Sequence, residues 1–76
     1  MKSVPALNSR KVIKTLKKLG FVEDRQKGSH LILVNPTTSR KTVLPIHAGK
    51  TIKKPLLKSI IEDDVGISIE DFLKAL

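Results

Sequence analysis

The sequence predicts an α+β domain in the order α-β-β-β-α, with a three-stranded antiparallel sheet, helices on one face of it and a short C-terminal helix. Apolar residues recur at helical spacing near both ends of the chain. Between them lie three short strand-like segments whose connections are too short for a parallel crossover. The length of 76 residues predicts one domain, which we expect to span residues 1–76.

The first helix is predicted to begin after Asn8, a good N-cap residue, with Leu7 and Val12 at the spacing of a hydrophobic staple. Gly20 is placed to end this helix in the left-handed conformation. One face of the helix is apolar and carries Val12, Ile13, Leu16 and Leu19.

Three strands should follow, over Phe21–Arg25, Ser29–Asn35 and Lys41–Ile46. Residues 26–28 and 35–40 have the composition of turns. Connections this short favour antiparallel pairing in a meander.

The second strand is apolar on both faces, with His30, Ile32 and Val34 on one side and Leu31 and Leu33 on the other. The helices of a small two-layer domain cover only one face of the sheet. The other face is then partly exposed or covered by another chain, which suggests a protein partner or self-association through that face.

A second helix should start near Pro55, which suits a first helical position, and end at Gly66. Its expected buried stripe is Leu56, Leu57, Ile60 and Ile61. Ser68 should cap the short last helix, with Asp71 three residues further on. Packing residues of this last helix are Phe72, Leu73 and Leu76.

The charge is strongly basic and uneven. Fifteen Lys and Arg against seven Asp and Glu give +8. Residues 1–58 hold fourteen basic and two acidic groups, a net of +12, and residues 59–76 hold one basic and five acidic groups, a net of −4. A basic body indicates a polyanionic partner such as nucleic acid, although a solvated basic surface has the same composition. The same two interpretations apply to the basic face of the first helix, which carries Lys11, Lys14 and Lys18.

Other classes of function are disfavoured. The chain has no cysteine, no segment of membrane-spanning length and no apolar leader near Met1, so we expect a cytoplasmic protein with no membrane association. It has no glycine-rich phosphate loop, and its two histidines lack nearby carboxylates, so we expect neither a metal nor a cofactor.

The histidines, His30 and His47, are the candidates for acid–base chemistry. Imidazole titrates near neutral pH. In RNA, a 2′-hydroxyl attacks the adjacent phosphate once a base removes its proton, and nearby cations stabilise the charge that develops. A histidine at a strand end is also a common structural residue, so the residues alone leave its role open.

Several stretches together resemble the HicA toxin family, small bacterial and archaeal mRNA interferases of toxin–antitoxin pairs. The resemblance runs from Leu7 to Phe72. The stretches that carry it are Leu16-Lys17-Lys18-Leu19-Gly20-Phe21, Gln26-Lys27-Gly28-Ser29-His30, Asn35-Pro36, Thr42-Val43-Leu44-Pro45-Ile46-His47, Leu57-Lys58-Ser59-Ile60-Ile61 and Val65-Gly66-Ile67-Ser68.

This resemblance implies a fold similar to a double-stranded-RNA-binding domain. It also implies an endoribonuclease that cuts mRNA without a metal and is inhibited by a HicB-type antitoxin. The histidine of Gly-Ser-His, here His30, would be catalytic. His47 matches the family's second histidine and would either contact phosphate or fix its loop. The family often has glycine just before the second helix, where this chain has Lys54-Pro55-Leu56.

Around His30, Gly28 would permit a tight turn, and Ser29 would keep the approach open or donate to a phosphate. Lys27 and His47 complete the phosphate contacts expected there. A further basic cluster at the start of the second helix is similar to the patch of double-stranded-RNA-binding domains and contains Lys53, Lys54 and Lys58. Two alternatives are a non-catalytic RNA-binding module with this fold and a protein-interaction module that uses only its exposed sheet face.

Overall fold

A computed structural model describes residues 4–47 and 49–76. Residues 1–3, and Ala48 of the loop predicted after the third strand, lie outside the described residues. The elements, in chain order, are α1 (Ser9–Lys18), β1 (Val22–Lys27), β2 (His30–Asn35), β3 (Arg40–Pro45), α2 (Lys54–Ser59), the π-helix η1 (Ile60–Val65) and α3 (Ile69–Lys74).

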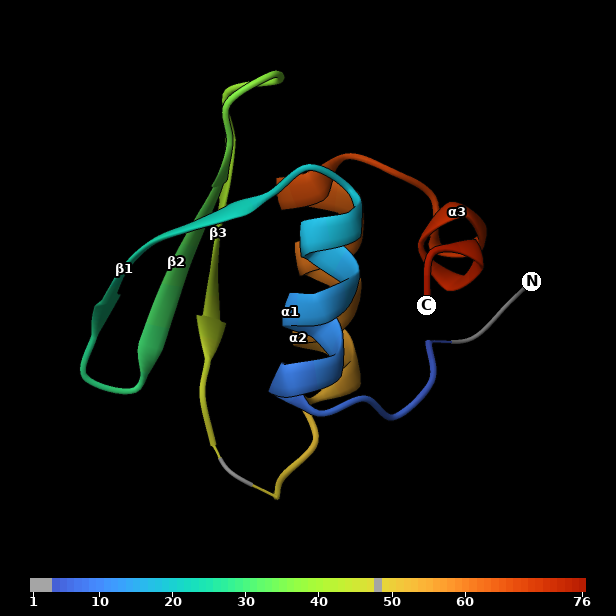
Figure 1. Cartoon of the computed structure of the whole chain (residues 1–76). Coiled ribbons are helices and arrows are strands. Elements are labelled where there is room, and N and C mark those ends of the chain that lie inside the picture. The colour runs from blue at the N-terminus through green and yellow to red at the C-terminus, as the bar shows by residue number, and fades with distance from the viewer. Residues whose placement is uncertain (1–3, 48) are drawn as a thin grey trace.

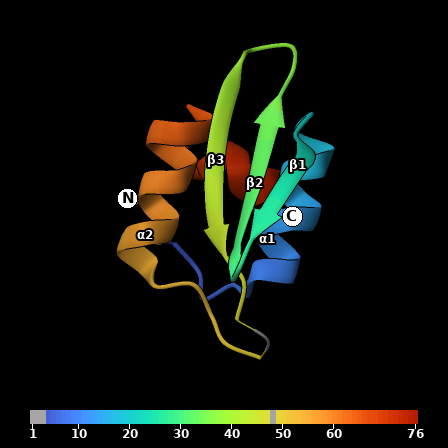
Figure 2. The ribbon, with the colours of Figure 1, turned by 90° about the vertical axis from the view of Figure 1, so that its left-hand side faces the viewer.

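The predicted architecture is confirmed. The three strands form an antiparallel sheet in the order β1-β2-β3. Helices α1 and α2 cover one face of this sheet, and α3 packs on their far side (Figure 1). None of the described helices covers the other face of the sheet (Figure 2). We call it the open face.

Both ends of α1 form as predicted. The Asn8 side chain accepts a hydrogen bond from the Lys11 backbone N–H at 2.9 Å, which satisfies one of the free donors of the first turn. At the other end Gly20 takes a φ of 100°, and the Phe21 N–H donates to the Leu16 carbonyl at 3.0 Å. These bonds form a Schellman motif, which turns the chain from the helix into the sheet and places Phe21 in the core.

The first hairpin differs from the prediction in its bounds. Strand β1 continues to Lys27, and the turn is Gly28-Ser29 instead of residues 26–28. Gly28 has a φ of 57° at the first turn position, which is the type II′ geometry that matches the twist of a two-residue hairpin. His30 therefore begins β2 and lies directly opposite Lys27.

Alternation along β2 is confirmed, because Leu31 and Leu33 are buried under the helices while Ile32 and Val34 are only partly covered. The core contains side chains from every helix and from β2 and β3, but none from β1, whose residues are all exposed. Its largest fully buried apolar members are Phe72, Leu16, Leu33, Leu44, Leu57, Ile60, Ile61 and Val12.

The second helix starts and ends as predicted, but its second half is not an α-helix. From Ile60 the chain forms η1, and Gly66 ends it with a φ of 79°. Leu57, Ile60 and Ile61 are buried, but Leu56 is 42% exposed, so its predicted place in the buried stripe is wrong. Ser68 caps α3 as expected, since its hydroxyl accepts from the Asp71 N–H at 3.1 Å.

Side chains join β3 to η1 at the end of the sheet that holds the 36–39 turn. Arg40 donates to the Asp63 carbonyl at 3.3 Å and to the Asp64 carbonyl at 3.5 Å. The Thr42 hydroxyl, which is buried, donates to the Asp64 carboxylate at 2.7 Å. This end is therefore fixed by polar contacts between elements that are distant in sequence.

Candidate functional site

The open face is organised in three cross-strand rows. The pairing of the strands places in each row one residue from β1, one from β2 and one from β3. These rows are Lys27, His30 and Pro45; Arg25, Ile32 and Val43; and Val22, Val34 and Lys41. The face thus has an apolar middle with basic side chains around it, and His30 lies in the row next to the Gly28-Ser29 turn.

His30 is held by the sheet while its side chain stays accessible. It pairs with Lys27 on one side and with Pro45 on the other, so the hydrogen-bonded ladder fixes its backbone from both directions. The residue is exposed. An imidazole on rigid backbone with a lysine directly opposite can accept a proton and keep a phosphate nearby.

One backbone hydrogen bond brings the second histidine to the same end of the sheet. The Ile46 N–H donates to the Ser29 carbonyl at 2.6 Å, which ties the 28–29 turn to the segment that follows β3. His47 comes next in the chain, and its carbonyl accepts from the Lys50 N–H at 3.1 Å. His30, Ser29 and His47 therefore lie at one end of the molecule.

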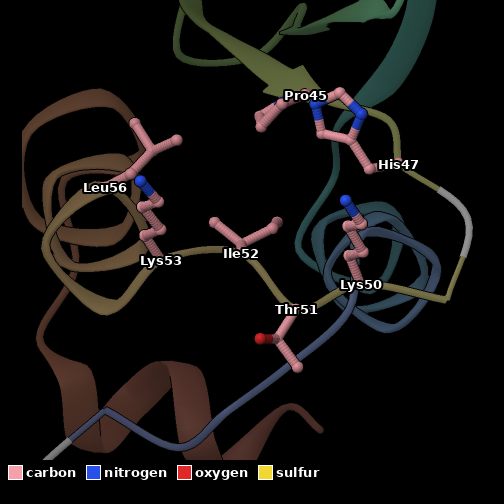
Figure 3. A pocket seen from close by; sticks show the side chains of 7 residues that line it. All are labelled: Pro45, His47, Lys50, Thr51, Ile52, Lys53 and Leu56. Carbon is pink, nitrogen blue, oxygen red and sulfur yellow. The ribbon is translucent and has the colours of Figure 1, made fainter.

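A cavity of about 370 Å³ opens beside His47 (Figure 3). Its apolar lining is Pro45, Ile52 and Leu56, and its polar lining is His47, Lys50, Thr51 and Lys53. The amine of Lys50 points toward the ring of His47, and the amine of Lys53 lies across the cavity beside Leu56 (Figure 3). We call this the His47 pocket.

Among the basic residues near His30 and His47, Arg25 is the one with an acidic partner in the described part of the chain. Within residues 4–47 and 49–76 the ion pairs are Lys17 with Glu23 at 2.6 Å and Arg25 with Asp24 at 3.8 Å. The acidic groups of η1 lie at the opposite end of the sheet, beside Arg40. The cations around His30 and the His47 pocket thus keep their charge available to an anionic ligand.

The structure brings together some of the predicted phosphate ligands and separates others. Lys27 and Ser29 adjoin His30, and Lys53 lines the pocket together with His47. Lys54 and Lys58 belong to α2. The remaining three are on α1, which covers the other face of the sheet from His30, and these are Lys11, Lys14 and Lys18.

Three basic residues of this region were missed by the sequence analysis. Arg25 and Lys41 lie on the open face, and Lys50 lines the His47 pocket. The alternation of β3 gave a usable signal for Lys41, since it is in phase with the apolar Val43. Lys50 gave none, because the path of an irregular loop depends on tertiary contacts such as the Ile52 N–H donating to the Leu7 carbonyl at 2.8 Å.

Two features are absent from the part of the chain that the structure describes. No helix there is both long and apolar enough to cross a membrane. No three His, Cys, Asp or Glu side chains gather there in a group that could hold a metal ion.

Comparison with protein families gives a match. A family model described as HicA toxin of bacterial toxin-antitoxin matches residues 9–66 of the 76 residues, a span that includes α1, the sheet, α2 and η1. Comparison with curated proteins and with solved structures gives no match.

Proposed function

The chain belongs to the HicA toxin family of toxin–antitoxin systems, and from this premise we propose that it is a metal-independent endoribonuclease that cuts mRNA in the cytoplasm. We propose that His30 is its general acid–base and that residues 1–76 act as a single HicA-like domain. The observation that carries the proposal is the setting of His30: an exposed imidazole on the central strand, opposite Lys27 and beside the turn tied to His47.

The proposed reaction is an internal transesterification. His30 takes the proton of a ribose 2′-hydroxyl, and the 2′-oxygen attacks the adjacent phosphorus. The bond from phosphorus to the 5′-oxygen of the next nucleotide breaks, and that oxygen receives a proton. The products are a 2′,3′-cyclic phosphate end and a 5′-hydroxyl end. No oxidant, reductant or metal enters this balance.

The basic side chains would serve the charged transition state. Lys27 lies closest to His30 in the ladder and is placed to stabilise negative charge on the reacting phosphate. Ser29 and His47 approach from the linked turn and loop. The more distant lysines would attract and hold flanking RNA, and they are Lys11, Lys14, Lys18, Lys53, Lys54 and Lys58.

A cleavage assay on purified protein tests the assignment. Wild-type protein should cut single-stranded RNA in the presence of EDTA, leave 2′,3′-cyclic phosphate ends and fail on a substrate with 2′-deoxyribose at the cut site. His30→Ala should remove most of this activity while RNA affinity stays near that of wild type. Full activity in a folded His30→Ala protein would transfer the assignment to His47. RNA binding without cleavage by wild type would favour the non-catalytic RNA-binding module.

We also propose that a HicB-type antitoxin inhibits the toxin by covering the open face. Val22 and Val43 of that face are 49% and 41% exposed, and the central row, which contains Val43, lies beside the row that contains His30. A partner that buries this apolar strip would block RNA at the same time. Stoichiometric antitoxin should stop cleavage and slow hydrogen exchange in β2. Inhibition without protection there would indicate a remote contact.

A further inference from the structure

We infer that the His47 pocket is a subsite for one nucleotide of single-stranded RNA, with the base on its apolar floor and a phosphate held by Lys50 and His47. The inference rests on the proposed function, because it assigns the binding of a nucleotide next to the cut site. It adds Lys50, Ile52 and Leu56 to the residues that meet the substrate.

The size and lining of the cavity suit a nucleotide. Its volume of about 370 Å³ lies within the range of roughly 300–1,000 Å³ that small-molecule sites occupy. Pro45, Ile52 and Leu56 supply the apolar part of the lining, against which a base can lie. Leu56 is 42% exposed although it is in the middle of α2, whose other leucine, Leu57, is buried. A base would cover this apolar surface.

The charges select an anion. In Figure 3 the amine of Lys50 points toward His47, so an anionic phosphate near this amine would also lie close to the imidazole. Lys53 adds a second ammonium across the cavity, and the described lining includes no carboxylate. A polyanion therefore complements the lining better than a neutral ligand does.

Continuity with His30 indicates which nucleotide enters. Pro45 is both the cross-strand partner of His30 and part of the pocket lining. A strand of RNA whose reacting phosphate lies at His30 would thus have a neighbouring nucleotide at Pro45. This nucleotide can enter the pocket without leaving the surface that carries the catalytic group.

The test measures binding of an uncleavable RNA, so it does not depend on catalysis. The probe is a fluorescein-labelled 2′-O-methyl octamer, and the readout is anisotropy over a range of salt concentrations. Lys50→Gln should weaken binding about tenfold at low salt and lower the salt slope by about 0.7. Lys74→Gln removes the same charge at the far end of α3 and should leave both values near wild type.

Leu56→Ala should weaken binding about fivefold without changing the salt slope, because it removes apolar contact and no charge. Leu56→Met keeps an apolar surface and should bind like wild type. Titration with uridine 5′-monophosphate should shift the amide signals of Ile52 and Leu56. Ribose 5-phosphate and inorganic phosphate should shift Lys50 but leave those two signals in place.

Two results would overturn the inference. Wild-type RNA affinity in both Lys50→Gln and Leu56→Ala would exclude the pocket from the RNA path. Weakened binding of the antitoxin in the same variants would then assign the pocket to the protein partner. If inorganic phosphate shifts the amide signals of Ile52 and Leu56 as much as the nucleotide does, the pocket binds anions and does not recognise a base. The two proposals can fail separately. If the pocket variants bind RNA like wild type but His30→Ala is inactive, the pocket is excluded and His30 keeps its catalytic assignment. If His30→Ala is active but the pocket variants bind RNA weakly, His30 loses its assignment and the pocket keeps its own.

Discussion

At the end of the sheet with the 36–39 turn, side chains bond to other elements, whereas at the end with the 28–29 turn they extend into solvent. Asn35 illustrates the first kind. Its side-chain oxygen accepts from the Thr37 N–H at 2.9 Å and the Thr38 N–H at 3.4 Å, and its amide donates to the Leu19 carbonyl at 3.4 Å. Together with the contacts of Arg40 and Thr42, these bonds join α1, the sheet and η1.

The opposite end is joined mainly by the backbone. Ile46 bonds to Ser29 and Ile52 bonds to Leu7 through main-chain groups. A side-chain bond at the 28–29 turn runs from the Gln26 amide to the Gly28 carbonyl at 3.0 Å. Backbone bonds hold the path of the chain and leave the histidines and lysines there free for a ligand. The polar side-chain contacts between elements and the proposed site thus lie at different ends of one small sheet.

The largest expected effect tests that division directly. His30→Ala should lower the cleavage rate about 10²–10⁴-fold, the usual contribution of a positioned acid–base group, while its melting temperature stays unchanged because the residue is exposed. Thr42→Val should do the reverse: it leaves Asp64 without its partner and lowers stability by roughly 1 kcal/mol, with cleavage by the folded protein retained. A large loss of stability in His30→Ala would contradict this division between the two ends of the sheet.

Asn35→Ala should have the next largest effect, and on stability alone. It leaves two N–H groups and a carbonyl in partly buried positions without this partner, at a cost of about 1–3 kcal/mol. In a chain of this size each kcal/mol lowers the melting temperature by about 4–8 °C. Asn8→Ala is the matched variant, since it removes a single exposed cap bond and should cost about 1 kcal/mol. If urea unfolding shows equal losses of unfolding free energy in Asn35→Ala and Asn8→Ala, the Asn35 bonds do not contribute more to stability than the Asn8 cap.

One glycine at each end of the sheet also distinguishes the two ends. Gly28 and Gly66 both have positive φ, so alanine should cost about 1–2 kcal/mol at either position. At Gly28 an added Cβ meets no described atom within 4 Å, but at Gly66 it would lie 2.5 Å from the Arg40 guanidinium carbon. Gly66→Ala should therefore be the more destabilising of the two. In a double-mutant cycle, Arg40→Ala should abolish the additional loss of stability that Gly66→Ala shows over Gly28→Ala. If this additional loss remains, backbone strain and not the contact with Arg40 causes the difference between the two glycines.

The smallest expected effect concerns the lysines on the two sides of the sheet. Lys27→Gln should lower the slope of log affinity against log salt for the uncleavable RNA by about 0.7, the value for one phosphate on a single strand. Lys14→Gln should change it less, because α1 lies behind the sheet and acts on bound RNA at a distance. Equal changes would show that the RNA also follows α1.

Features set by neighbouring residues were predictable from the sequence. Asn8, Gly20, Gly66 and Ser68 all lie where helix ends were expected, because caps depend on residues within one turn. The open face followed from the alternation of β2. The end of β1 was placed two residues early, because all six of its residues are exposed and give no apolar alternation.

Features that depend on contacts between distant residues could not be predicted from the sequence. Residues 56, 57, 60 and 61 are all apolar, and their spacing alone does not decide that Leu56 faces the pocket and not the core. His30 was identified by its resemblance to a family pattern. The arrangement of Lys50, His47 and Pro45 around one cavity required the path of the 46–53 loop, which local propensities do not determine.

The π-helix has a consequence for the lengths that relatives of this chain can have. In η1 the hydrogen bonds span five residues, as from the Gly66 N–H to the Ile61 carbonyl at 2.9 Å, so the segment holds one residue more than an α-helix of the same course. Deleting one residue between 60 and 65 would restore α-helical bonding over the same course, so the residues after the deletion would keep their places in the fold. Relatives that are one residue shorter in this segment are therefore expected to have an uninterrupted α-helix here.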